Sequence, residues 1–316
     1  MNSTQWEVHL DAYLAVQRAV GNPMVAEEKL LRDFLAYCAS SLPTSSGQAA
    51  MDWARIVGNR LGVSGERRRL TVVRSFLIFL RPLCAEPLLL PIPPRRAPRR
   101  KLPYVFSAAE TAALLSRAGR LWPHESLRPL TFQTVLGLLA STGLRAGEAV
   151  RLEVADLLLD PDSPHLVVRE TKFRKSRLVP LHSSAVLPLK SYLAERQRRA
   201  YDGLSDRVFL CHRGGPLDYG MLHETFQTLL RQAGIQPVTG QRRPTLTSFR
   251  HSFAVNRLVA WHQEGRDVND LMPQLSVYMG HVQPDCTYWY LTATPELLIA
   301  ASNRFALPAD QCGGVR

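Results

Sequence analysis

The sequence contains little that would tie the protein to a metal ion, a disulfide framework or ATP. Its five cysteines are scattered, odd in number and form no CxxC pair, so we expect reduced thiols in a cytoplasmic protein. Cys211 and His212 stand together, but no further residues follow at ligand spacing. Asp160 and Asp162 lie in an expected turn and make a poor two-metal site. With no GxxxxGK loop either, the sequence predicts no metal and no cofactor.

Long apolar runs and acidic excess are also missing. The apolar stretch at residues 87–92 is far too short to cross a bilayer. The first ten residues lack a basic and then apolar pattern, which predicts no signal peptide. What the chain has instead is a net charge of +12 and 46% hydrophobic residues over 316 positions. The hydrophobic fraction excludes a disordered chain, and the length allows two domains. The positive charge favours a polyanionic partner such as nucleic acid, but charge alone fits a soluble basic protein equally well.

A proline-rich segment at residues 90–103 is the clearest boundary, because proline blocks both helix and sheet. The sequence therefore predicts a helical domain at 1–89, a linker at 90–103 and a larger domain at 104–316. The linker is either a solvated spacer or an extended basic segment that contacts the phosphate backbone of DNA, and we interpret it as the latter. Its basic residues are Arg95, Arg96, Arg99, Arg100 and Lys101.

Apolar residues recur at helical spacing in four stretches before the linker, near residues 6–15, 30–38, 51–61 and 70–80. Ser64 is expected to cap the fourth helix, so the pattern predicts a four-helix bundle. One face of that last helix is basic and is either solvated or DNA-binding. We expect DNA contacts from Arg67, Arg68 and Arg69.

The larger domain has a mixed pattern. Helices are expected at residues 107–117 and 130–141, with Gly143 as a left-handed C-cap and a new helix near Arg145. Three short β-like runs follow at 157–159, 166–171 and 177–181, and helical patterns resume at 187–199, 222–233, 248–262 and 271–279. The predicted fold class is mostly α with a small antiparallel β-sheet, an α+β domain behind the helical bundle.

Five side chains of this domain have the chemistry that phosphodiester transfer needs. Arginine forks bind non-bridging oxygens, lysine or histidine can supply a proton, and a tyrosine hydroxyl can hold phosphate covalently. Each residue alone is weak evidence, since most arginines and lysines are surface charges. Their chain order and local contexts carry the weight: Arg145, Lys172, Arg250, His281 and Tyr290.

These contexts resemble the boxes of the tyrosine recombinase family, also called phage integrases. The resemblance covers residues 104–300, and the helical bundle and linker agree with the family's core-binding domain in architecture only. The matching segments are Thr142-Gly143-Leu144-Arg145-Ala146-Gly147-Glu148, the hairpin at 171–181 around Lys172, Phe249-Arg250-His251-Ser252, Met279-Gly280-His281, and Tyr290 nine residues later.

The resemblance implies a site-specific recombinase that acts on double-stranded DNA. Arg145, Arg250 and His281 would clamp the phosphate, Tyr290 would form a 3′-phosphotyrosyl bond, and Lys172 would protonate the 5′-hydroxyl, without metal or ATP. The family implies a C-shaped two-domain clamp and a tetramer on two DNA sites. The tail at 292–316 is apolar; it either packs on its own chain or docks on a neighbouring protomer, and we expect the latter. We expect a cytoplasmic, nucleoid-associated protein with no membrane contact. Further expected DNA contacts in the hairpin are Arg174, Lys175 and Arg177.

Thr247 departs from the family pattern, which usually has histidine three residues before the second arginine. Threonine cannot carry charge or take up a proton, so activity could depend on His251 or His281, or on a partner subunit. Glu148 is expected to be a buried carboxylate that orients Arg145. Tyr288 is a competing nucleophile, but two residues along a helix point about 200° apart, and the family interval selects Tyr290.

The segment around Tyr290 also resembles transposon-borne recombinases encoded in sets of three, which suggests sister recombinases as partners. Two alternatives remain open from the sequence. One is a DNA-binding accessory subunit that does not cut, which Thr247 motivates. The other is a nicking and rejoining enzyme of the type IB topoisomerase kind, which would cleave without site preference.

Overall fold

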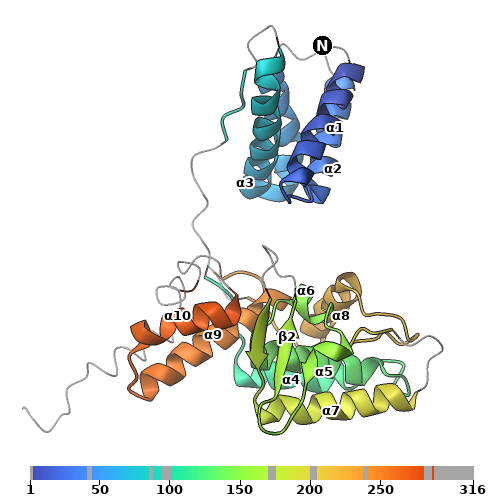
Figure 1. The fold of residues 1–316 in the computed structure, drawn as a ribbon, viewed down its shortest axis with the longest axis vertical. Helices are drawn as coiled ribbons and strands as arrows, with labels where there is room; N and C mark the ends of the chain where they lie inside the picture. The colour runs from blue at the N-terminus through green and yellow to red at the C-terminus, as the bar shows by residue number, and fades with distance from the viewer. Residues whose placement is uncertain are drawn as a thin grey trace, which may run out of the picture. The chain divides into compact units, whose positions relative to one another are not determined.

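The computed structural model describes residues 3–40, 45–84, 89–93, 102–169, 176–199, 205–237, 241–280 and 287. They belong to two compact units, residues 1–100 and residues 101–316 (Figure 1). Each unit has a hydrophobic core of its own. Within the described residues, no helix is both long and apolar enough to cross a membrane.

The first unit is a helical bundle of α1 (Ser3–Ala19), α2 (Val25–Ser40) and α3 (Ser46–Leu80), followed by the short 3-10 helix η1 (Arg81–Leu83). Aromatic rings join the helices across the core. The ring centroids of Phe34 and Trp53 are 5.4 Å apart, and those of Tyr13 and Phe76 are 5.5 Å apart. Residues 89–92 return to this bundle, where the carbonyl of Pro91 accepts a hydrogen bond from Arg74 Nη1 at 3.0 Å.

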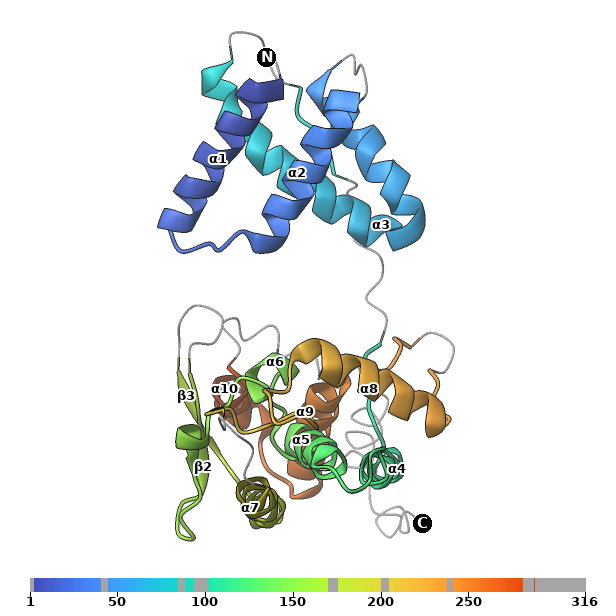
Figure 2. The same ribbon diagram turned by 90° about the vertical axis from the view of Figure 1, so that its right-hand side faces the viewer.

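The prediction of a fourth helix that begins at Ser64 was wrong. Ser64 lies inside α3, which is helical without a break from Ser46 to Leu80. No proline interrupts this stretch, so the hydrogen-bond ladder continues, but glycine and serine pairs are common sites of helix bending. Gly62, Ser64 and Gly65 supply such a site, and the ribbon of α3 changes direction near its middle (Figure 2). The sequence signal interpreted as a cap lies inside this continuous helix.

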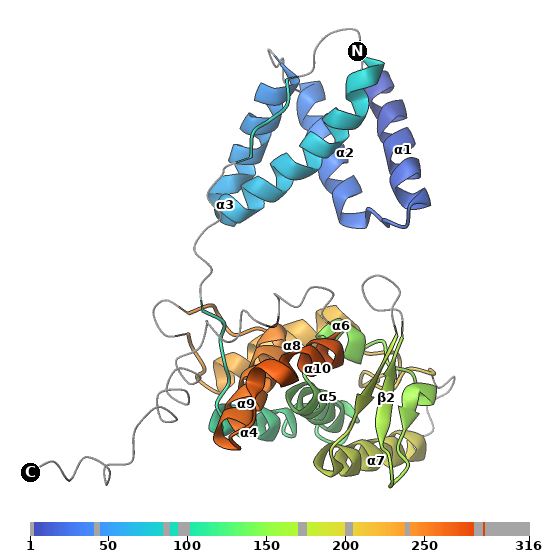
Figure 3. The ribbon, with the colours of Figure 1, turned by 60° about the vertical axis from the view of Figure 1, so that its left-hand side comes forward.

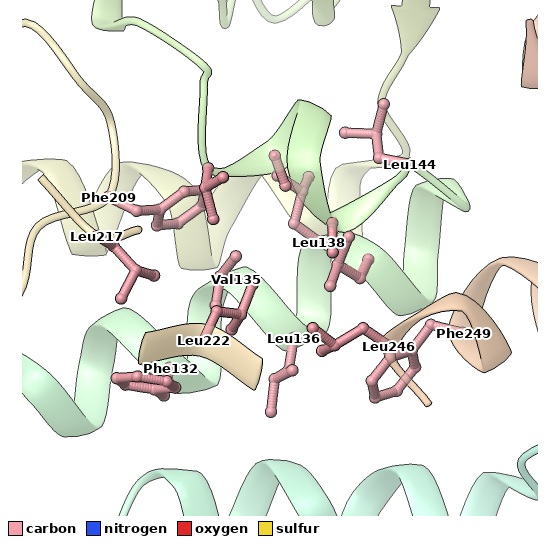
Figure 4. Close-up of a cluster of buried hydrophobic side chains, with 14 of the residues drawn as sticks. Phe132, Val135, Leu136, Leu138, Leu144, Phe209, Leu217, Leu222, Leu246 and Phe249 are labelled. Carbon is pink, nitrogen blue, oxygen red and sulfur yellow. The ribbon is translucent and has the colours of Figure 1, made fainter. Parts of the chain in front are cut away.

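The second unit is built around α5 (Arg128–Thr142), which is buried on several sides. It packs against α4 (Ala108–Ala118), α7 (Ser183–Arg198) and α9 (Leu246–Gln263), while α8 (Tyr219–Gln232) covers α4 (Figure 2). Figure 4 shows how leucine and phenylalanine side chains from these elements meet, with Phe132, Leu136 and Phe249 among them. This core fixes the positions of the ends of α5 and α9, from which the candidate site residues project.

A three-stranded antiparallel sheet lies at one edge of this unit (Figure 3). Its strands are β1 (Leu157–Leu158), β2 (His165–Val168) and β3 (Arg177–Pro180), in the order β1-β2-β3, with Leu166 opposite Val179. The short elements α6 (Ala146–Ala149) and η2 (Val154–Asp156) precede it, and α10 (Val268–Met279) packs against both α9 and β3. The predicted fold class, mostly helical with a small antiparallel sheet, is confirmed.

Candidate active site

Arg145 stands at the N-cap of α6, two residues after the left-handed glycine that ends α5. Gly143 has φ +63°, as its sequence context predicted, and an added Cβ would meet the Phe253 ring at 2.7 Å. Arg145 Nη1 donates to Glu148 Oε1 at 2.7 Å, and its backbone N–H donates to Glu148 Oε2 at 3.0 Å. The Arg145 side chain remains 38% exposed, so its guanidinium is oriented by Glu148 and still open to solvent.

Arg250 lies in the first two turns of α9 and is 4% exposed. Its Nη1 donates to the carbonyl oxygen of Gly143 at 2.9 Å, and its Nη2 donates to that of Met279. The guanidinium therefore joins the C-terminal ends of α5 and α10. A cation is favourable there, because the last carbonyls of a helix have no intrahelical partner and carry the negative end of the dipole.

Three consecutive carbonyls at the end of α10 accept hydrogen bonds from three different arginines. Tyr278 accepts from Arg177 Nε at 3.0 Å, Met279 accepts from Arg250 Nη2, and Gly280 accepts from Arg145 Nη2 at 3.2 Å. Gly280 is the left-handed C-cap, with φ +65°. The two sequence-predicted arginines thus meet on the two residues that directly precede His281.

The sequence predicts a DNA contact for Arg177, and the structure shows an inward-facing side chain there instead of an exposed one. Its side chain is only 10% exposed, and its Nη2 donates to Glu148 Oε2 at 2.8 Å. The physical reason is the period of the strand: Arg177 shares the inner face of β3 with buried Val179, whereas Leu178 and Pro180 are exposed. Sequence reasoning treated Arg177 as one more basic residue of the hairpin.

Glu148 is a buried carboxylate between two arginines. Burial raises the pKa of its carboxyl, but hydrogen bonds and charge from Arg177, together with Arg145, outweigh burial and lower the pKa to about 2. Glu148 is therefore ionised at neutral pH and compensates part of the positive charge that the arginines bring together.

His251 follows Arg250 in α9 and is half-buried. Burial lowers the pKa of its imidazole to about 4, and the positive charges of Arg242 and Arg250 act in the same direction. His251 is consequently neutral at pH 7. Thr247, which replaces the usual histidine, is exposed in the first turn of α9.

Several predicted residues lie outside the described residues. These are Lys172, His281 and Tyr290 of the catalytic set, Arg174 and Lys175 of the hairpin, and Arg95, Arg96, Arg99, Arg100 and Lys101 of the linker. Their roles remain predictions. Thr287, three residues before Tyr290, is described and fully buried.

The basic face of α3 is less uniform than the sequence suggested. Arg67 is exposed, and Arg68 Nη2 lies 3.3 Å from Glu27 Oε1. Arg69 differs: its side chain is 12% exposed, its guanidinium carbon lies 4.7 Å from the centroid of Trp53, and Asp33 Oδ2 is 3.5 Å away. Arg69 packs within the bundle, and its contact with DNA stays a prediction. In the part of the chain that the structure describes, no group of three or more His, Cys, Asp or Glu residues gathers as a metal site.

The structure thus brings two of the sequence-predicted arginines to the end of α10. The model of the phage integrase family matches residues 110–296, more than half of the chain. The chain belongs to the phage integrase family, and it is a tyrosine recombinase.

Relatives with related names match this chain over all or part of its length. A putative integrase/recombinase, y4rB, of Sinorhizobium fredii is 38% identical over 301 residues, which cover 92% of this chain and 94% of that protein. The tyrosine recombinase XerD of Mycobacterium tuberculosis is 34% identical over 203 residues, 64% of this chain and 60% of that one.

Solved structures share the fold. The XerH site-specific recombinase, bound to its palindromic difH substrate after cleavage, superposes with a TM-score of 0.68 at 16% identity, over 97% of this chain and 85% of that one. The Tn1549 transposon integrase with circular intermediate DNA gives a TM-score of 0.64 at 18% identity, over 97% of this chain and 100% of that one.

Proposed function

We propose that this recombinase cleaves and rejoins double-stranded DNA at a specific site through a 3′-phosphotyrosyl intermediate on Tyr290. The observation that supports it best is the meeting of Arg145 and Arg250, 105 positions apart, on the carbonyls of Gly280 and Met279. Cations fixed before the reaction stabilise a phosphorane-like transition state without reorganisation. His281, which follows directly, would complete the phosphate clamp.

The two arginines would have different tasks. Arg145 is partly exposed and held by Glu148, so its guanidinium is the one that a non-bridging phosphate oxygen reaches from solvent. Arg250 is buried and bridges the C-terminal ends of α5 and α10. It would supply positive charge behind the phosphate-binding residues and hold the two helix ends in place. Tyr290 would attack the phosphorus, Lys172 would give its proton to the departing 5′-oxygen, and a partner 5′-hydroxyl would reverse the step.

The wider assembly is proposed on the family and its relatives. XerH binds a palindromic site, and two-fold DNA sites suit a symmetric assembly. We infer a tetramer on two DNA sites, with the tail at 292–316 docked in trans and sister recombinases as possible members. The relation to integrases also supports a role in integration or transposition of a mobile element, in the cytoplasm at the nucleoid.

A second candidate, an accessory subunit that binds DNA without cutting it, has one observation in its favour. Thr247 cannot take up a proton, and His251 is neutral and half-buried, so neither supplies the charge that the usual histidine would add. Such a subunit would bind DNA with strong salt dependence but would form no covalent intermediate.

The test uses a nicked suicide substrate made from the ends of the host element, with chelator present. We expect a covalent protein–DNA adduct on a denaturing gel from the wild-type chain and from Tyr288→Phe, but none from Tyr290→Phe. Tight site-specific binding without any adduct would favour the accessory subunit. Adducts of equal yield on unrelated DNA would favour the topoisomerase alternative.

A further inference from the structure

Arg177 joins three elements of the second unit through one side chain. Its Nη1 and Nη2 donate to the two oxygens of Glu148 at 3.2 and 2.8 Å, and its Nε donates to the carbonyl of Tyr278 at 3.0 Å. Glu148 belongs to α6, Arg177 to β3 and Tyr278 to α10. The fixed fork of arginine suits this bridge, because a lysine ammonium offers no planar pair of donors.

Arg177 also limits how the backbone can turn after α10. A Cβ added to Gly280 would lie 2.9 Å from Arg177 Nη1 and 3.1 Å from its Cζ. The guanidinium thus packs directly on the α-carbon of the C-cap, while its Nε holds the carbonyl two residues earlier. The last turn of α10 is fixed from its side and from its end by the same group.

Glu148 makes this arrangement cooperative. Its two oxygens accept four hydrogen bonds, from the backbone N–H and Nη1 of Arg145 and from Nη1 and Nη2 of Arg177. That number fills the acceptor capacity of a carboxylate. Any shift of Arg177 therefore disturbs the partner that orients Arg145, and buried networks of this kind have few alternative arrangements.

We infer that Arg177 is a positioning residue for strand cleavage. It does not contact DNA; it sets the end of α10, and so the place where His281 begins, relative to Arg145. This inference rests on the proposed function, which gives His281 and Arg145 their task at the phosphate. It predicts a kinetic defect at the chemical step that DNA affinity does not share.

Arg177→Gln is the first test, with Arg196→Gln as matched control. Arg196 is a buried arginine of α7 that also donates to two backbone carbonyls, those of Ser205 and Arg207. At saturating suicide substrate, we expect Arg177→Gln to form adduct about 10 to 100 times more slowly, since small misplacements in a clamp have such effects. DNA affinity should stay within about twofold, and folded Arg196→Gln should cleave at the wild-type rate.

Arg177→Lys provides a second variant where Arg177→Gln folds poorly. Lysine keeps a positive charge beside Glu148 but cannot bridge Glu148 and the Tyr278 carbonyl together. We expect a folded protein with a slow cleavage step. Wild-type cleavage by folded Arg177→Lys would overturn the inference, as would a loss of DNA affinity large enough to account for the slower adduct.

Coupling to His281 separates positioning from general destabilisation. If Arg177 acts through His281, Arg177→Gln should slow adduct formation less than about threefold in a His281→Ala background, because the two changes remove one interaction. Arg196→Gln should behave the same in both backgrounds. An equal loss from Arg177→Gln with and without His281 would overturn the inference.

Hydrogen exchange on the free protein tests the structural half without any activity. The Gly280 N–H donates to the Val277 carbonyl at 2.9 Å, and we expect its peptide to exchange faster in Arg177→Gln than in Arg196→Gln. If the wild-type protein forms no adduct, the proposed function is refuted. Faster exchange of the Gly280 peptide in Arg177→Gln would still show that Arg177 holds the end of α10. Unchanged exchange would overturn the inference itself.

Discussion

Arg250 Nη1 lies 2.9 Å from the carbonyl oxygen of Gly143, a residue 107 positions earlier in the chain. This bond places the buried guanidinium at the end of α5, two residues from Arg145. The same Arg250 holds the Met279 carbonyl, so one side chain brings the first arginine box and the Gly-His box together. The clamp is therefore organised by the ends of helices, whose carbonyls are suited to cations.

The C-cap of α10 gives the first prediction. Gly280→Ala should lower the free energy of unfolding by more than Gly234→Ala does, although both glycines have φ +65°. Each substitution costs about 1 to 2 kcal/mol for the left-handed backbone, but only position 280 adds a clash, since Gly234 has no atom within 4 Å of its Cβ site. Urea unfolding of both variants measures the difference, and equal losses would contradict the close packing of Arg177 on Gly280.

The second prediction concerns the missing histidine. Thr247→His adds a group that can donate to phosphate and exchange a proton, at an exposed position in the first turn of α9. We expect adduct formation to accelerate, up to about 10² fold, because one preorganised donor has effects of that order. Thr247→Asn is the control for a donor without a titratable group. A histidine variant that cleaves no faster than wild type would show that another group fills this role.

The pH dependence of stability follows from His251. Its folded pKa of about 4 lies below the usual 6.5, so below pH 6.5 the unfolded chain binds a proton that the folded chain does not. The contribution of neutral His251 to the free energy of unfolding is complete above pH 6.5 and is lost as the pH falls towards 4. His251→Asn should remove about 1 to 3 kcal/mol of this decline. Parallel stability curves of variant and wild type between pH 7 and 4 would refute the prediction.

The helical unit gives a fourth prediction, from two neighbouring arginines of α3. Arg67→Gln should weaken DNA binding and reduce the slope of log affinity against log salt by about one, with little change in stability. Arg69→Gln should instead destabilise the bundle by about 1 to 3 kcal/mol, because it loses Trp53 and Asp33. Salt titrations of binding and thermal unfolding of both variants separate the two roles; an exchange of the two phenotypes would contradict them.

The elements of the second unit could be predicted because their signals are local. Gly143 marked the end of a helix, and the alternation at residues 177–181 marked a strand. Ser64 was wrongly predicted to cap a helix, because a serine beside glycines also occurs inside a helix that bends. The sequence identified Arg145 and Arg250 by their motifs.

The partners of these arginines lay beyond sequence reasoning. Backbone carbonyls such as those of Tyr278, Met279 and Gly280 occur at every residue, so no sequence pattern marks which one an arginine will meet. The sequence did contain a sign that Arg177 points inward. Arg177 and Val179 are two residues apart in the strand and therefore lie on one face, whereas Leu178 lies on the opposite face. The prediction of a DNA contact gave more weight to its charge than to this period.

Mass spectrometry of the trapped protein–DNA adduct tests the central claim most directly. Trypsin releases residues 267–304 as one peptide, which contains Tyr278, Tyr288 and Tyr290. After nuclease digestion, fragmentation of this peptide assigns the attached nucleotide to one side chain. We predict a 3′-linked nucleotide on Tyr290. A nucleotide on Tyr288, or on a residue outside this peptide, would contradict it.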